Sequence, residues 1–146
     1  MNQLNNINFS TQFFNDMDYE ELLAFRPPSN DRTGDAHNQQ RIRNIIQGVE
    51  KLMQTLGKGI TYTQLRNILP IVKNDAFKED PSGLLLAIPK LAYLQGRPQR
   101  GEEGHALIQF IRELAWKVET KDQYLAFEEI VNAIVAYHKL YDKKQR

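Results

Sequence analysis

Residues 36–56 read A-H-N-Q-Q-R-I-R-N-I-I-Q-G-V-E-K-L-M-Q-T-L, and they form the clearest helical pattern in the chain. Apolar residues recur at spacings of three and four over two heptads, at Ile42, Ile45, Ile46, Val49, Leu52, Met53 and Leu56. A stripe of this width predicts an amphipathic helix that faces a core and ends at Gly57. A coiled coil is the alternative, but the width of the stripe favours a helix within a bundle.

The following stretch reads G-K-G-I-T-Y-T-Q-L-R-N-I-L-P-I-V-K (57–73) and combines a flexible basic loop with a second amphipathic helix. Thr61 or Thr63 can cap its first turn by accepting a hydrogen bond from an unpaired amide. Pro70 predicts a kink, because it donates no hydrogen bond and its ring crowds the carbonyl of Arg66. The helix is expected to continue past this kink, since its apolar stripe runs on through Leu65, Ile68, Leu69 and Val72.

This helix and the loop before it carry three cations that suit a phosphate backbone. Arg66 and Lys73 each follow a stripe residue, so both emerge along one border of the apolar face, roughly 10 Å apart at 1.5 Å rise per residue. Lys58 stands between two glycines that free the backbone around it. A solvated core edge is the plainer interpretation, because Lys and Arg cover such edges with their methylenes while the charge stays in water.

Three further segments show helical periodicity (84–95, 105–120 and 121–141), and no segment alternates as a strand does. In the first of them, Pro89 leaves two alternatives: a short turn followed by a helix from about Ile88, or one kinked helix. We therefore predict an all-α fold, a single small bundle of about five helices.

The last two predicted helices each carry a detail that bears on contacts. Trp116 either broadens the core, the interpretation that we adopt, or anchors a contact with another chain. Asp122 is expected to cap the final helix, whose wide apolar belt packs on two neighbours or on a partner subunit. This belt and Trp116 together lead us to expect weak self-association, such as a dimer.

Residues 1–35 differ from the rest of the chain in charge. They contain six acidic and two basic residues, a balance of −4, whereas residues 36–146 contain 12 acidic and 17 basic residues, a balance of +5. We expect a polar, acidic and partly disordered leader with a tail that can dock, followed by a compact helical domain at 36–146. The positive balance of that domain is compatible with nucleic acid but is a weak indicator of it.

Features that the sequence lacks exclude several classes of protein. The chain has no cysteine, which removes disulfides, thiolate nucleophiles and cysteine-ligated zinc together. No apolar run approaches the roughly 20 residues of a membrane helix, and residues 1–10 are too polar for a signal peptide. We expect a soluble, cytoplasmic protein without membrane contact.

The sequence also offers little for catalysis. His138 and Asp142 lie one helical turn apart and could hold a metal, but packing is the more typical role of such a histidine. The adjacent glutamates at 102–103 and 128–129 point in different directions on a helix, which suits paired acid–base work poorly. We therefore expect no enzyme activity, no metal and no cofactor.

Three motifs together resemble a known family. They are I-T-Y-T-Q-L-R-N-I-L (60–69), L-A-Y-L-Q-G-R (91–97) and F-E-E-I-V-N-A-I-V-A-Y-H-K-L-Y (127–141). Each is weak alone, but their combination and order resemble the small subunit of type III-A CRISPR effector complexes over about residues 36–146. The resemblance implies a non-catalytic helical bundle, several copies of which line up beside larger subunits and hold the guide CRISPR RNA and target RNA in antiviral defence.

The resemblance also implies RNA contacts. Arg66 in L-R-N-I-L and Arg97 in Q-G-R match cations that the family directs at RNA. Nearby cations are added from proximity, which gives the predicted RNA-binding set Lys58, Arg66, Lys73, Arg97 and Arg100. Gln64 departs from the family, many of whose members have a lysine just before the L-R or I-R pair.

Two other functions compete with RNA binding. The first is a purely structural, homo-oligomeric helical module that is dimeric through its last helix and makes no direct nucleic-acid contact. Salt dependence separates it from RNA binding, because neutralising phosphates releases counterions and bundle packing does not. The second is a small metal-dependent nuclease, which requires clustered carboxylates that the sequence does not display.

Overall fold

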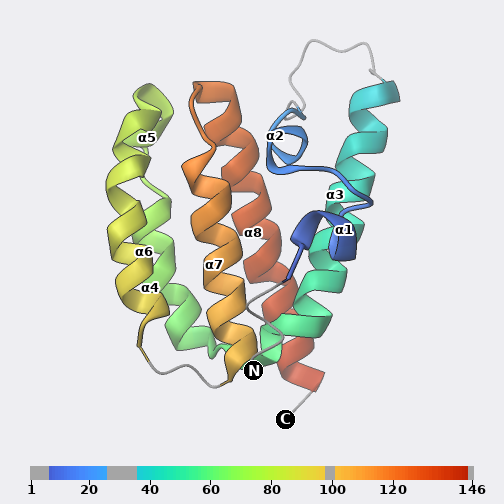
Figure 1. The fold of residues 1–146 in the computed structure, drawn as a ribbon, viewed down its shortest axis with the longest axis vertical. Helices are drawn as coiled ribbons and strands as arrows, with labels where there is room; N and C mark the ends of the chain where they lie inside the picture. Colours follow the sequence, from blue (N-terminus) through green and yellow to red (C-terminus); the bar gives the residue numbers. More distant parts are fainter. Residues whose placement is uncertain (1–6, 26–35, 98–100, 145–146) are drawn as a thin grey trace.

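The longer helices of the computed structural model follow the apolar stripes of the sequence (Figure 1). The structure describes residues 7–25, 36–97 and 101–144. Within these ranges the longer helices are α3 (Ala36–Leu56), α4 (Tyr62–Val72), α6 (Ala87–Gln95), α7 (Glu102–Trp116) and α8 (Lys121–Lys144). The shorter elements are α1 (Phe9–Phe13), α2 (Tyr19–Leu22), α5 (Ala76–Glu79) and the 3-10 segments η2 (Gly57–Gly59) and η3 (Pro81–Leu86). No strand occurs within the same ranges, so the all-α prediction is confirmed.

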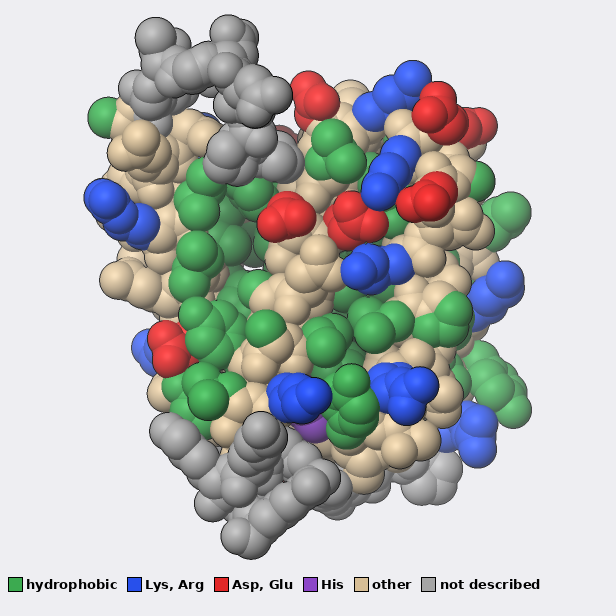
Figure 2. Space-filling view, turned by 180° about the vertical axis from the view of Figure 1, so that it is seen from behind, with side chains coloured by type: hydrophobic (Ala, Val, Ile, Leu, Met, Phe, Trp, Pro, Cys, Tyr) green, Lys and Arg blue, Asp and Glu red, His purple; other side chains and the backbone are tan. Residues whose placement is uncertain are grey.

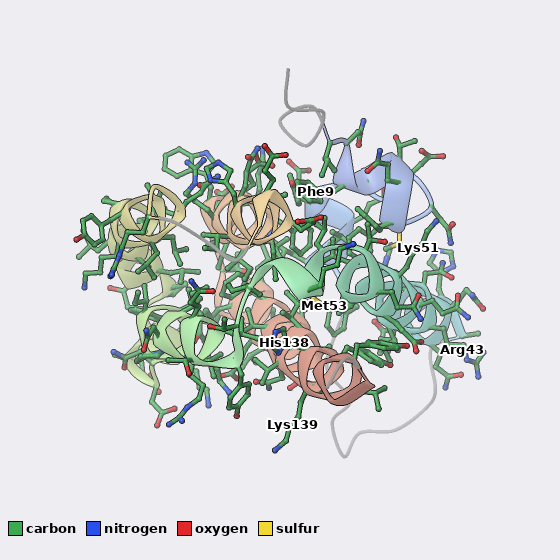
Figure 3. All side chains as sticks on the ribbon, turned by 90° about the horizontal axis from the view of Figure 1, so that it is seen from below. Phe9, Arg43, Lys51, Met53, His138 and Lys139 are labelled. Atoms are coloured by element: carbon green, nitrogen blue, oxygen red, sulfur yellow. The ribbon has the colours of Figure 1, made fainter. Side chains whose placement is uncertain are left out.

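The longer helices lie in two layers. Seen from below in Figure 3, α6 and α7 form one layer with α1 beside them, and α4, α8 and α3 form the other. Within these layers α6 packs along α7 and α3 packs along α8, while α4 contacts both α6 and α8. Most of the apolar stripe of α3 is therefore buried inside a bundle, as its width predicted, whereas Ile46 at the edge of the stripe is 44% exposed. None of the described helices is both long and apolar enough to cross a membrane.

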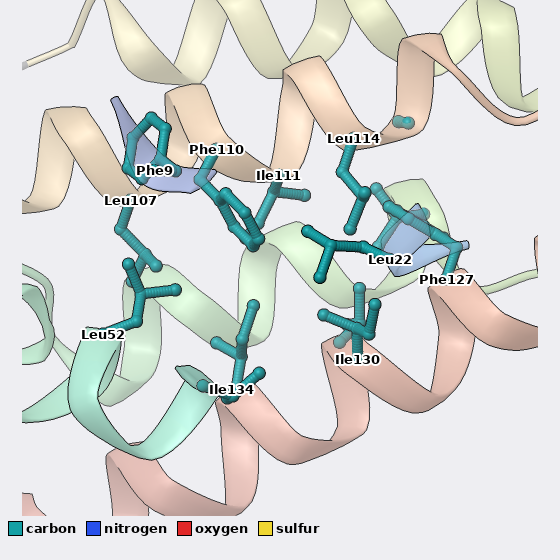
Figure 4. Packing of buried hydrophobic residues seen from close by; sticks show 14 of the residues in the cluster. Phe9, Leu22, Leu52, Leu107, Phe110, Ile111, Leu114, Phe127, Ile130 and Ile134 are labelled. Atoms are coloured by element: carbon teal, nitrogen blue, oxygen red, sulfur yellow. The ribbon is translucent and has the colours of Figure 1, made fainter. Parts of the chain in front are cut away.

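The hydrophobic core lies between the layers. Figure 4 shows apolar side chains of three long helices meeting there: Leu52 of α3, Leu107, Phe110, Ile111 and Leu114 of α7, and Phe127, Ile130 and Ile134 of α8. Burying one side chain of this size contributes about 1.5–3 kcal/mol. Phe9 of α1 and Leu22 of α2 enter the same core, so the N-terminal segment shares in this stabilisation.

The N-terminal segment is held by packing and by a partly buried hydrogen bond to α7. Its buried residues are Phe9, Phe13, Phe14, Met17, Leu22, Leu23 and Phe25. The hydroxyl of Tyr19 donates to Glu113 Oε1 of α7 at 2.6 Å, and burial together with this carboxylate raises the pKa of Tyr19. The segment thus docks on α3 and α7. The domain boundary at residue 35 stays a prediction, because residues 26–35 lie outside those described.

The bounds of α4 and α6 show how the chain accommodates Pro70 and Pro89. α4 continues through Pro70 to Val72, as expected from its periodicity. In the next segment η3 precedes α6, which begins at Ala87, so the short turn followed by a helix is correct. Pro89 is then the third residue of α6, a position whose N–H has no partner within the helix, and the proline loses nothing there.

Two sequence predictions are wrong. Trp116 is 62% exposed and not part of the core, because it is the last residue of α7 and stands next to the buried face that ends at Leu114 and Ala115. Asp122 does not cap α8. Thr120 Oγ1 accepts from the Gln123 amide at 3.1 Å, and the Gln123 side chain accepts from the Thr120 amide at 3.1 Å, so this reciprocal pair begins the helix.

Candidate nucleic-acid interface

A reciprocal cap fixes the start of α4. Thr61 Oγ1 accepts from the Gln64 amide at 3.0 Å, and Gln64 Oε1 accepts from the Thr61 amide at 2.8 Å. Of the two predicted caps, Thr61 is therefore the one used. The backbone amide and the side-chain oxygen of Gln64 both take part in this cap, so the residue contributes to the start of the helix and not to its charge.

The same helix turns an aromatic residue and a cation to the surface. Leu65, Ile68 and Val72 are buried, which leaves Tyr62 and Arg66, four residues apart, on the outer side of α4. Lys139 approaches from α8. Arg66 Cζ lies 5.9 Å and Lys139 Nζ lies 6.0 Å from the centroid of the Tyr62 ring. We call Tyr62, Arg66 and Lys139 the aromatic–cation cluster.

His138 lies beneath this cluster. Figure 3 shows His138 directed into the bundle while Lys139, the next residue, projects outward from α8. The imidazole stacks on the Tyr62 ring with centroids 6.3 Å apart and an interplanar angle of 25°. Its Nε2 donates to the carbonyl of Ile60 at 2.8 Å, which ties the segment before α4 to α8. The Nδ1 atom is buried without a hydrogen-bond partner among the described residues.

The packing role of His138 agrees with the sequence interpretation. The histidine is 3% exposed, and its Nε2–H group donates a hydrogen bond to the backbone carbonyl of Ile60. Among the residues whose side chains the structure describes, 7–25, 36–97 and 101–141, no group of three His, Asp or Glu is arranged to hold a metal ion, and Asp142 lies outside them.

Lys73 lies at the other end of α4 on the same side of the bundle. Its ammonium donates to Asn132 Oδ1 of α8 at 2.6 Å. Beside it, the Tyr124 hydroxyl donates to the carbonyl of Val72 at 2.9 Å, which fixes the end of α4 against α8. One Lys73 donor is thus engaged within the protein, and a lysine ammonium has two more.

The balance of basic and acidic side chains changes along the surface that α4 and α8 form. Lys78 lies 3.3 Å from Asp75 and 3.9 Å from Glu128, and these carboxylates raise its pKa. Figure 2 shows the back of the molecule, where most of the acidic side chains gather in the upper half and basic side chains stand among hydrophobic ones in the lower half. The surface around the start of α4 therefore offers cations with fewer competing carboxylates.

Two more of the predicted RNA-binding residues, Lys58 and Arg97, lie beside the ends of helices. Lys58 in η2 lies 4.0 Å from Glu103 of α7. The Gly101 amide donates to the Gly59 carbonyl at 3.2 Å, so η2 meets the residue that precedes α7. Arg97 is exposed directly after α6. Arg100 lies outside the described residues.

A comparison with protein families identifies the chain. A family model described as Csm2 Type III-A matches residues 39–144. The chain belongs to the Csm2 family. This confirms the predicted resemblance, and it makes the chain a small subunit of a type III-A CRISPR complex that associates with other subunits of that complex. The matched region includes all of α4 and α8. No curated protein and no solved structure matches the chain at a significant level.

Two members of the aromatic–cation cluster were missed by the sequence analysis. Tyr62 stands four residues before Arg66, a spacing that places both on one side of a helix and could have indicated their pairing. Lys139 follows the buried His138 and so had to face outward, but its approach to Tyr62 depends on how α8 packs on α4. Sequence spacing alone does not contain that information.

Proposed function

We propose that this Csm2 subunit is non-catalytic, lines the path of the guide and target RNA in the complex, and supports assembly of the complex in cytoplasmic antiviral defence. The observation that carries the proposal is the aromatic–cation cluster on α4 and α8. An exposed ring with a guanidinium and an ammonium beside it combines the two kinds of contact by which proteins hold single strands, base stacking and phosphate neutralisation. The family, one of structural small subunits, supports the non-catalytic role.

The other predicted cations would extend this contact along the strand. Lys58 and Glu103 form a partly exposed ion pair at 4.0 Å, and such pairs contribute only about 0–1 kcal/mol, so a phosphate can replace the carboxylate at little cost. Lys73 keeps two donors beyond its bond to Asn132. Together with Arg66, Arg97 and Arg100, these residues remain the proposed RNA-binding set.

Alanine variants of Arg66 and Arg97 test the proposal. Either substitution is expected to weaken RNA binding by the assembled complex almost equally for all sequences, because phosphate contacts position a strand without reading it. The salt dependence of binding should become shallower by roughly 0.7 per lost contact on a single strand. Both quantities come from binding titrations at several salt concentrations, with the melting temperature of the purified subunit measured in parallel.

The matched control is Arg43→Ala. Arg43 is an exposed arginine of α3, and Figure 3 shows it on the side of the bundle away from α4. Arg43→Ala should leave both the RNA affinity and the salt dependence of RNA binding unchanged. If Arg66→Ala and Arg97→Ala behave like this control, these arginines are solvated edge residues and the proposed RNA path is wrong.

A structural oligomeric role is the second candidate, and exposed apolar side chains favour it. Trp116 of α7 is 62% exposed and lines a hollow of about 470 Å³ together with Ile88 of α6 and Tyr19 of α2. Single exposed apolar residues are ordinary, but a large aromatic ring beside an apolar hollow is typical of interaction sites.

Sedimentation of the purified chain tests self-association. At roughly millimolar concentration we expect a mass above that of the monomer, and Trp116→Ala should move the distribution back towards the monomer because the ring supplies much of the apolar area. Leu86→Ala, which alters an exposed apolar residue of η3 away from the last helix, is the control. A monomer throughout the concentration series would reject self-association of the isolated chain.

A further inference from the structure

We propose that Tyr62 is a stacking platform for one unpaired nucleobase of the bound RNA, and that Arg66 and Lys139 hold phosphates next to that nucleobase. The inference rests on the proposed function and adds to it a named base contact. It predicts that the face of α4 and α8 holds the RNA through a base as well as through its backbone.

The Tyr62 ring has one supported side and one open side. His138, which is 3% exposed, stacks on it from within the bundle, and Tyr62 as a whole residue is 36% exposed. The open part of the ring therefore faces away from His138. The histidine is itself fixed by its hydrogen bond to the Ile60 carbonyl, so the platform is rigid before any ligand arrives. A rigid aromatic surface loses little conformational entropy when a base stacks on it.

The two cations lie over the ring but are not in contact with it. Arg66 Cζ and Lys139 Nζ lie 5.9 and 6.0 Å from the ring centroid, at the outer limit of a cation–π interaction. Atoms in van der Waals contact are about 3.5–4.0 Å apart, so neither group packs tightly on the ring. A base therefore reaches the ring when these two long side chains turn aside, and their charges then lie beside the phosphates that flank the base.

The local structure gives Tyr62 no other evident task. The start of α4 is already capped by Thr61 and Gln64. The buried stripe of the helix is formed by Leu65, Ile68 and Val72. A partner that offered only anions would be held by the cations without an aromatic ring. A single-stranded nucleic acid offers both a flat base and a phosphate within the reach of one cluster, and aromatic platforms flanked by cations bind such strands.

Binding of two oligonucleotides to the full chain at low ionic strength tests the inference. One probe is a fluorescent oligouridine, and the other is an abasic oligomer with the same number of phosphates. Tyr62→Leu is expected to weaken oligouridine binding by about 5- to 150-fold, the range found for loss of one stacked base, and to leave the abasic oligomer unaffected. Tyr62→Phe keeps the ring and should stay within about 2-fold of the unchanged chain. Arg66→Ala should weaken binding of both probes.

Trp116→Leu is the matched control, since Trp116 is an exposed aromatic residue of α7 and lies outside the cluster. It should bind both probes as the unchanged chain does. A second measurement uses the assembled complex. Target RNA carrying 5-iodouridine at one position at a time is irradiated, and cross-linked residues are identified by mass spectrometry, because this base couples to aromatic rings on which it stacks. At least one position should cross-link to Tyr62, and Tyr62→Leu should abolish that product.

The outcomes separate this inference from the proposed function. If Tyr62→Leu binds oligouridine normally while Arg66→Ala does not, or if cross-links form on α4 and α8 but not at Tyr62, the RNA lies on this face without stacking and the inference is wrong. Equal losses by Tyr62→Leu for both probes would mean that the ring only positions the cations, which also overturns it. Failure of every variant to change RNA binding, with no cross-link on either helix, would overturn the proposed function as well.

Discussion

Replacing Phe14 with alanine is expected to lower the free energy of unfolding by roughly 3–5 kcal/mol, the range for truncating a buried phenylalanine. Phe14 is fully buried although it lies in the N-terminal segment. Its ring stacks on Phe110 of α7, with centroids 5.5 Å apart and planes at 12°. On the other side it meets Gly48 of α3, where an added Cβ would lie 2.3 Å from Phe14 Cδ1. The side chain thus joins α3 to α7, and the cavity left by alanine would lie at the centre of the core.

Urea denaturation of the full chain measures this effect. Gln12→Ala is the control, because Gln12 is an exposed residue of α1 in the same segment and should change stability by less than about 0.5 kcal/mol. Phe14→Leu retains most of the volume and should fall between the two. Phe14→Ala with the same midpoint as Gln12→Ala would show that the N-terminal segment does not pack on α3 and α7 in solution.

The sequence predicted that the N-terminal segment can dock, but not how much the segment contributes to the stability of the fold. Helical periodicity reports which side of a helix is buried, and it placed α3 correctly because that helix has one continuous stripe. Residues 9–17 have scattered aromatics without such a stripe, and their burial depends on a recess between α3 and α7 that exists only in the folded protein. Gly48 within the α3 stripe was the available indication, since a glycine inside a helix costs about 1 kcal/mol relative to alanine and suggests close approach of another group.

The candidate site was predictable in part for a similar reason. The exposure of Arg66 follows from the stripe of its own helix, and the structure agrees with it. The pairing of Tyr62 with Lys139 joins residues 77 positions apart, and only the packing of α8 against α4 brings them together. Trp116 was misassigned because an aromatic residue next to an apolar stripe is usually buried. At the last turn of α7, no helix among the described residues covers Trp116, which is 62% exposed.

Replacing Gly59 with alanine is expected to damage both the fold and the RNA site. A Cβ at this position would lie 2.2 Å from the Gly104 amide nitrogen and 2.8 Å from the Glu103 carbonyl carbon. These are backbone atoms in the first turn of α7, so a side-chain rotation cannot relieve the clash and η2 must move away from α7. Gly59 does not have a positive φ, so the requirement is for space and not for an unusual conformation. Overpacking of this kind costs typically 1–3 kcal/mol, and more when backbone must shift.

A shift of η2 would also displace the aromatic–cation cluster, because Tyr62 stands only three residues after Gly59 in the chain. Displacing Gly59 also breaks the hydrogen bond from the Gly101 amide and pulls on Ile60, whose carbonyl holds His138. Tyr62 and Arg66 then lose their fixed position, so RNA binding should weaken even at temperatures where the variant stays folded. Gly96→Ala is the matched control, because its Cβ would meet its nearest neighbours at 3.6 Å, an ordinary contact. Thermal melting and RNA titration of both variants decide the matter. A Gly59→Ala chain that melts and binds RNA as Gly96→Ala does would show that η2 is not packed on α7 and does not position the site.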